Sequence, residues 1–166
     1  PLAEETYLGP LAQRKQVGVL AEQVREAVQR GAKVLLGGNA TKLNGRGNYF
    51  EPTVLVNVTN DMRVMQEESF GPIIGLMPCA GDEEAVRLMN DSRFGLTASI
   101  WSRDENAALK LAPHIEAGTV YLNRCDYLDP ALPWIGYKES GLGCSLSHHG
   151  FMEVTKLKSY HFKKVQ

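Results

Sequence analysis

Short apolar runs that alternate with helical segments constrain the fold of this chain most strongly. Apolar runs occupy residues 72–79, 98–101 and 118–123, and the two intervening segments open at Asp82 and Asp104. Aspartate is a favoured helix N-cap, and apolar residues follow it at helical spacing. This strand–helix–strand order is typical of right-handed βαβ units on a parallel sheet. Because the run 72–79 is apolar at almost every position, we expect that strand to be buried on both faces.

The N-terminal part of the chain predicts one more helix and two more strands. Apolar residues recur at helical spacing between positions 17 and 28, and Gly31 follows as a helix C-terminal signal. The runs 33–36 and 52–58 predict strands, and the polar segment 39–48 predicts a loop between them. We therefore predict an α/β fold with a mostly parallel sheet built from βαβ units.

The C-terminal residues predict a strand extension beyond this sheet. Residues 158–163 alternate polar and apolar side chains, as a half-exposed strand does. A strand at a chain end often pairs with another sheet edge. The lysines near the C-terminus are Lys156, Lys158, Lys163 and Lys164. They fit solvated strand positions better than a phosphate site.

Composition argues against two classes of partner. Of the 166 residues, 43% are hydrophobic and 22% are charged, which suits one globular domain with its own core. The net charge of −1 and the scattered basic residues offer no basic face to a nucleic acid. No apolar run approaches the roughly 18 residues that a membrane span requires, so we expect no membrane partner.

The cysteines and the first residues give expectations about the cellular compartment of the protein and about whether the chain is a fragment. Cys79, Cys125 and Cys144 form no Cys-x-x-Cys pair, so neither a disulfide framework nor a zinc site is indicated. Reduced thiols in a cytoplasmic protein are the expectation. The chain opens at Pro1 without an initiator Met or a signal-peptide pattern, and we expect a fragment of a longer protein.

No stretch carries a clear catalytic, metal or phosphate motif. The Gly-rich segment 138–143 lacks the third glycine of a nucleotide-binding loop. His148 and His149 are adjacent, which is poor ligand geometry, and no acidic or histidine cluster has metal spacing. Cys125 follows Arg124 and could form a low-pKa thiolate, but a small buried apolar side chain is the simpler interpretation of each cysteine.

One stretch remains unexplained by composition and spacing. Two adjacent acids, Glu67 and Glu68, and the ring of Phe70 stand immediately before the apolar run that starts at Pro72. From the residues alone, a solvated acid pair with Phe70 in the core is the simpler interpretation. A binding site at the mouth of a buried strand is the alternative.

Several strings along the chain, in this order and spacing, resemble motifs of the NAD(P)-dependent aldehyde dehydrogenase family. The acid-and-ring stretch, for example, resembles that family's Glu-x-Phe-Gly-Pro. The strings are GAKVLLGG (31–38), FEPTVL (50–55), EESFGP (67–72), Asn90 with FGLTA (94–98), GTVYLN (118–123) and YKESGLG (137–143).

The resemblance implies that the chain is the C-terminal portion of such an enzyme. Residues 1–155 would be the second part of the catalytic domain, and residues 156–166 the terminal strand through which subunits form a homo-oligomer. The family's nucleophilic Cys, general-base Glu and coenzyme domain lie upstream of the matched region. The whole enzyme would oxidise an aldehyde to a carboxylic acid through a Cys thioester. We therefore expect no activity from the chain alone, and the alternative is a non-catalytic remnant that acts as an interaction or assembly module.

The resemblance also assigns coenzyme-binding residues. Glu68 would accept hydrogen bonds from the nicotinamide-ribose hydroxyls, and Phe70 would pack beside that ribose and the ring. Glu67 would stay solvated. Gln16 matches a position near the adenosine side in some relatives, but Val19 stands where those relatives have a lysine. NAD and NADP both remain open as the cofactor.

The segment 123–134 resembles the loop that lines the family's aldehyde path. Tyr127, Leu128 and Trp134 would line it and favour an apolar or aromatic substrate end, although plain packing under the loop is the alternative. The chain departs from the family pattern at Ile135, where Gly is usual, and at Ser145, where a Glu often assists the base. The aldehyde itself therefore remains open, and we assign neither a catalytic nor a metal-binding residue.

Overall fold

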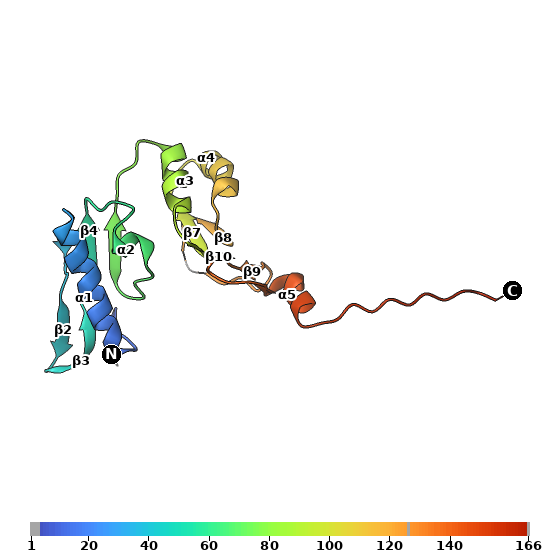
Figure 1. Cartoon of the computed structure of the whole chain (residues 1–166), viewed down its shortest axis with the longest axis horizontal. Coiled ribbons are helices and arrows are strands. Elements are labelled where there is room, and N and C mark those ends of the chain that lie inside the picture. Colours follow the sequence, from blue (N-terminus) through green and yellow to red (C-terminus); the bar gives the residue numbers. More distant parts are fainter. Residues whose placement is uncertain (1–3, 126, 166) are drawn as a thin grey trace. The chain divides into compact units, whose positions relative to one another are not determined.

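The computed structural model describes residues 4–125 and 127–165. The chain divides into two units, Pro1–Ala80 and Gly81–Gln166, which are described separately (Figure 1). In the described part of the chain, no helix combines the length and the apolar character that crossing a bilayer requires.

Helix α1 (Arg14–Gln29) organises the first unit. Its buried side chains include Leu20 and Val24, which belong to one core cluster with Leu55 and Met62. The helix ends as its sequence predicts. Gly31 has a φ of +104°, and the N–H groups of the two residues after the C-cap bond back to carbonyls of the last turn, at 3.0 and 2.9 Å. This pairing is a Schellman motif, which requires a residue such as glycine in the left-handed region.

Helix α1 packs beside a three-stranded sheet of order β1–β4–β5, formed by β1 (Lys33–Leu36), β4 (Thr53–Val56) and β5 (Ile73–Leu76). Strand β4 runs antiparallel to β1 and parallel to β5. The expectation that this last strand is buried on both faces is wrong for this structure. Ile74 and Leu76 are 55% and 46% exposed, because only one face of β5 is covered within this unit.

The polar segment expected to be a loop is a hairpin of β2 (Ala40–Leu43) and β3 (Arg46–Phe50). Its turn is formed by Asn44 and Gly45, both with positive φ (51° and 76°). Such a pair is the turn that matches the twist of a two-residue hairpin. The Asn-Gly dipeptide was the local signal for it. A short helix, α2 (Arg63–Gln66), precedes β5.

The second unit contains the βαβ arrangement that the sequence predicts. Strands β7 (Thr97–Ile100) and β8 (Thr119–Leu122) pair in parallel, and α4 (Glu105–Leu111) with a 3₁₀ turn, η1 (Ala112–His114), lies between them. Asp104 caps α4, accepting a hydrogen bond from the Ala107 N–H at 3.0 Å. Helix α3 (Asp82–Asn90) has Gly81 as its N-cap, so Asp82 contributes its charge to the first turn rather than a capping bond.

Antiparallel pairs complete the second unit. β6 (Phe94–Gly95) pairs with β10 (Tyr137–Lys138), and β9 (Trp134–Ile135) pairs with β11 (Cys144–Ser145), which leads into α5 (Ser147–Glu153). The α/β class is confirmed. In place of the mostly parallel sheet, the described residues form small separate sheets in which only β4–β5 and β7–β8 are parallel.

The strand expected at the C-terminus is not formed in this structure. Residues 155–165 are assigned neither helix nor strand and are drawn as an extended segment in Figure 1. The rings of Tyr160 and Phe162 stack 6.1 Å apart, so alternate side chains share a side as in a strand. A strand needs a hydrogen-bonding partner, and the described residues provide none for this segment.

In the second unit, two of the segments that resemble family motifs bond to each other: Asn90 with residues 94–98, and residues 137–143. Lys138 donates from Nζ to the carbonyl of Asn90 at 2.6 Å and lies 2.7 Å from a carboxylate oxygen of Glu116. The Asn90 side chain in turn bonds to the His114 carbonyl and the Glu116 N–H, at 2.8 and 2.9 Å. Ser140 accepts the Gly95 N–H at 2.9 Å. The segment 138–143 therefore uses its polar groups in packing.

A substitution at Gly118 tests the close backbone packing of the second unit. A Cβ there would lie 1.6 Å from the Ile135 carbonyl oxygen, so Gly118→Ala requires the backbone to move. We expect the free energy of unfolding to fall by about 3 kcal/mol, measured by urea denaturation. Gly81→Ala, in open space in the same unit, should cost less than about 1 kcal/mol. Equal effects of the two substitutions would show that the close approach is absent.

Candidate functional site

The loop 67–72 enters β5 and is held from both sides. The Gln16 amide donates to the Ser69 carbonyl, and the Pro72 carbonyl accepts the Thr53 N–H at 2.8 Å. Gly71 lies against α1 so closely that a Cβ would stand 2.5 Å from a methyl carbon of Leu20, which is fully buried. A buried leucine cannot easily yield, so glycine is required here. The backbone of the loop is thus fixed to the core of the first unit.

The side chains of Glu68 and Phe70 point away from these anchors. Phe70 is 77% exposed and has a φ of +47°. The simpler interpretation, with Phe70 in the core, is therefore wrong for this structure. Glu68 is exposed, and among the described residues its carboxylate has no hydrogen bond or ion pair. A left-handed phenylalanine costs about 1–2 kcal/mol, and because such strain is often found at functional sites, Phe70 is a candidate site residue.

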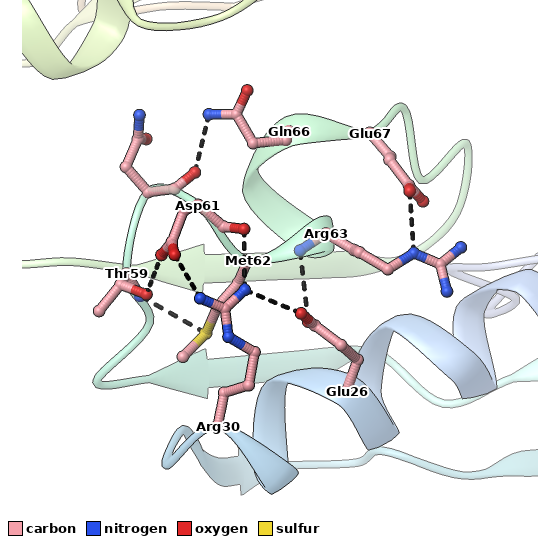
Figure 2. Close-up of polar contacts among 9 residues, drawn as sticks. Glu26, Arg30, Thr59, Asp61, Met62, Arg63, Gln66 and Glu67 are labelled. Atoms are coloured by element: carbon pink, nitrogen blue, oxygen red, sulfur yellow. Dashed lines mark hydrogen bonds and ion pairs between the residues drawn. The ribbon is translucent and has the colours of Figure 1, made fainter.

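Glu67 lies in a different environment from its neighbour. Its carboxylate accepts the Arg63 Nε–H at 2.8 Å, as Figure 2 shows. Of these two adjacent acids, Glu67 is therefore ion-paired, whereas Glu68 has no partner among the described residues. The prediction that Glu67 is merely solvated is wrong, since it forms this ion pair.

Figure 2 also shows a second group of ion pairs beside the first. Arg30 lies 2.9 Å from Glu26 and pairs with Asp61, which accepts the Thr59 hydroxyl at 2.6 Å. The Thr59 hydrogen bond and then Arg30 hold the pKa of Asp61 below its ordinary value. Because the folded-state pKa is lowered, this contribution to stability is present at neutral pH and is lost as the pH falls through that pKa.

Aromatic and charged side chains line a cavity of about 160 Å³ in the second unit. Tyr127 and Trp134 are among its lining residues, whereas Leu128 is half-exposed and is not. The Tyr121 hydroxyl donates to the Tyr127 carbonyl and accepts its N–H at 3.2 Å, which fixes the loop. Asp126, which belongs to the same expected segment, lies outside the described residues.

Arg124 is the lining residue that sequence reasoning missed as a site residue. Its guanidinium lies 3.9 Å from the Tyr127 ring centroid, a cation–π contact that orients the side chain. Asp129 also lines the cavity, but it accepts the Ala131 N–H at 2.9 Å. The sequence signal was a cation beside the aromatic residues of the loop. The lining of the cavity therefore contains one basic and one acidic residue, Arg124 and Asp129, beside its aromatic residues.

The remaining candidates are placed as follows. Cys79 and Cys125 are exposed and Cys144 is half-buried, so the expectation of buried cysteines is wrong for the first two. Ser145 is the β-sheet partner of Trp134. Within residues 4–125 and 127–165, no three His, Cys, Asp or Glu side chains gather as metal ligands would.

Known proteins resemble this chain over nearly its whole length. The model of the aldehyde dehydrogenase family matches residues 1–160. An aldehyde dehydrogenase of Paenarthrobacter nicotinovorans is 43% identical over 159 residues, which is 96% of this chain and 34% of that protein. The NAD(P)+ succinate semialdehyde dehydrogenase Sad of Escherichia coli is 40% identical with the same coverage.

Solved structures agree with these matches. An NAD-dependent aldehyde dehydrogenase from Sinorhizobium meliloti superposes with a TM-score of 0.90 at 37% identity, covering 95% of this chain and 31% of that one. Betaine aldehyde dehydrogenase from Staphylococcus aureus, in complex with NAD+, superposes with a TM-score of 0.85 at 33% identity, covering 91% and 30%. This chain spans about a third of the length of the relatives it matches. The chain belongs to the aldehyde dehydrogenase family.

Proposed function

We propose that this chain is the C-terminal portion of an NAD(P)-dependent aldehyde dehydrogenase that oxidises an aldehyde to a carboxylic acid. Residues 1–155 would complete the catalytic domain, and residues 156–166 would form the strand that pairs subunits into a homo-oligomer. The cytoplasm is the proposed compartment, in keeping with three cysteines that are all free. The family match supports this proposal, and the loop that exposes Glu68 and Phe70 carries it.

The residues of this loop suit a dinucleotide. An ionised carboxylate only accepts hydrogen bonds, and the two adjacent hydroxyls of a ribose are both donors. Glu68 would hold those hydroxyls, and the exposed ring of Phe70 would restrict the nicotinamide by contact. The anchored backbone means that little order must be gained on binding. When bound, NAD or NADP accepts the hydride that leaves the aldehyde.

Glu68→Gln tests this assignment in the full-length enzyme. The amide offers one neutral acceptor in place of two charged ones, so we expect the KM for the coenzyme to rise about tenfold. Hydride transfer, followed by single-turnover absorbance, should slow as well. Glu83→Gln, an exposed acid in the first turn of α3, is the matched control and should change neither quantity. An unchanged coenzyme KM and hydride-transfer rate in Glu68→Gln would refute the role of Glu68.

The isolated chain should be inactive, because the nucleophile, the general base and the coenzyme domain are implied to lie elsewhere. We expect no NADH or NADPH formation from a panel of aldehydes, while the full-length enzyme assayed in parallel turns over. Measurable turnover by the 166-residue chain would overturn this part of the proposal.

An interaction or assembly module without catalysis is the alternative function. The exposed apolar side chains of the terminal segment favour it, since Leu157 and Phe162 are 88% and 83% exposed and would be covered by strand pairing. The coding sequence upstream of Pro1 separates the two functions. A continuous reading frame with a Cys-bearing loop supports the enzyme, and a true start at Pro1 supports the module.

The cavity of the second unit suggests the substrate class. We propose an aldehyde whose far end carries a carboxylate, because Arg124 lines the cavity beside Tyr127 and Trp134. A guanidinium binds a carboxylate with two parallel hydrogen bonds. The relatives named as succinate semialdehyde dehydrogenases, from Escherichia coli and from Mycobacterium ulcerans, act on such a compound by name. This proposal adds a charged group to the expected apolar or aromatic substrate end.

Arg124→Met tests this substrate class in the full-length enzyme. We expect kcat/KM for succinic semialdehyde to fall at least about tenfold, the loss of one charged hydrogen-bond pair. The neutral methyl ester of the same aldehyde should lose less than about threefold. Arg103→Met, at an exposed arginine of the same unit, is the control. Equal losses for the acid and the ester would contradict a charge-based role.

A further inference from the structure

We propose that Ser99 and Tyr121 are positioning residues for Arg124, and that they set the preference of the cavity for the charged end of the aldehyde. Their hydroxyl groups hold the main chain of the loop that carries Arg124, and they act through that arginine rather than by contact with the substrate. This inference rests on the proposed substrate class, and it assigns a role to two residues of the sheet behind the cavity loop.

Ser99 and Tyr121 are neighbours on the parallel strand pair of the second unit. Ser99 on β7 is the register partner of Tyr121 on β8 (Figure 1). Register partners of a parallel pair direct their side chains to the same face of the sheet. Each residue is also the last but one of its strand. Both hydroxyls therefore lie near the edge of the sheet at which β8 continues into the cavity loop.

Each hydroxyl bonds to the main chain of that loop. The Ser99 hydroxyl donates to the Arg124 carbonyl, 25 residues away in the sequence. The Tyr121 hydroxyl donates to the Tyr127 carbonyl and accepts the Tyr127 N–H at 3.2 Å. The loop is thus held at both members of the cation–π contact, in which the guanidinium carbon lies 3.9 Å from the ring centroid.

The start of the loop is fixed as well. The Asn123 N–H donates to the Ile100 carbonyl at 2.8 Å. The Asn123 side chain accepts the Ser102 N–H at 2.9 Å and donates to the Ser102 carbonyl at 2.8 Å. Asn123 has a φ of +53°, a conformation that asparagine tolerates better than most residues, and it turns the chain out of the strand direction. Arg124 therefore follows directly after a fixed point.

Burial explains why the hydroxyl bonds matter. Arg124 and Tyr127 are both exposed, so core packing does not hold them. Tyr121 is only 9% exposed and belongs to the sheet, so it provides a rigid anchor. An arginine that is already held in one orientation loses less conformational entropy when it binds a carboxylate. The two hydroxyls should therefore strengthen binding of the charged end of the aldehyde.

Neither hydroxyl has a hydrogen to offer the substrate. A phenol donates one hydrogen, and that of Tyr121 goes to the Tyr127 carbonyl. The ring of Tyr121 lines the cavity, but its hydroxyl is already used by the loop. Ser99 likewise donates its one hydrogen to the Arg124 carbonyl and is not among the lining residues.

Tyr121→Phe in the full-length enzyme removes the hydroxyl and keeps the ring. We expect the KM for succinic semialdehyde to rise about fivefold and kcat to stay within about twofold of the parent, because Arg124 is less well positioned. The KM for the neutral methyl ester should change less than about twofold. Ser99→Ala should give the same pattern with a rise of about threefold, and Ser99→Thr, which keeps a hydroxyl, should retain the parental KM.

A double variant separates positioning from direct contact. In the Arg124→Met background no guanidinium remains to be positioned, so Tyr121→Phe should change the KM for the acid by less than about 1.5-fold. A direct hydrogen bond to the substrate would make the two losses multiply, and that result would overturn the proposal. Tyr137→Phe is the matched control, at an exposed tyrosine of β10 that does not line the cavity, and it should leave every KM unchanged.

The outcomes distinguish this inference from the proposed substrate class. If Arg124→Met discriminates between the acid and the ester, but Tyr121→Phe and Ser99→Ala impair both aldehydes equally or neither, the positioning role alone is overturned. Equal losses for the acid and the ester in Arg124→Met would instead refute the substrate class, and the positioning role would fall with it.

Discussion

The close packing of Gly71 on Leu20 is the contact on which the candidate coenzyme site depends. It brings the loop 67–72 so near to α1 that no side chain fits at Gly71, and Leu20 cannot move because it is fully buried. Gln16 holds the same loop by donating to the Ser69 carbonyl, which lies between Glu68 and Phe70. Both of these side chains are exposed, and Phe70 has a left-handed backbone conformation whose strain the surrounding packing must offset.

The segments that resemble family motifs have different roles in the two units. In the first unit, EESFGP presents groups that can bind a ligand. In the second, Lys138, Asn90 and Gly118 are occupied with hydrogen bonds and close backbone contacts. A resemblance in such residues reflects packing that only certain side chains allow, and it supports the fold more than the chemistry.

Local signals in the sequence predicted the elements whose causes are local. Gly31 ends α1 and Asp104 caps α4, and the βαβ unit follows from its apolar runs. The Asn44-Gly45 turn has an equally local cause, although a loop was expected for this segment. The burial of β5 could not be predicted, because exposure of Ile74 depends on what covers the sheet and not on the strand itself. The contact of Gln16 could not be predicted either, since Gln16 meets its partner 53 residues away. Arg124 contacts Tyr127 three residues along the chain, so its signal was local.

A crystal structure of the full-length enzyme with NAD or NADP tests the central claim most directly. The measured quantity is the distance from the Glu68 carboxylate oxygens to the two hydroxyls of the nicotinamide ribose. We predict that both hydroxyls lie within hydrogen-bond distance, about 2.5–3.0 Å, of Glu68, with Phe70 against the ribose and Glu67 still paired with Arg63. A coenzyme bound with its ribose away from Glu68, or held by Glu67 instead, would contradict the account.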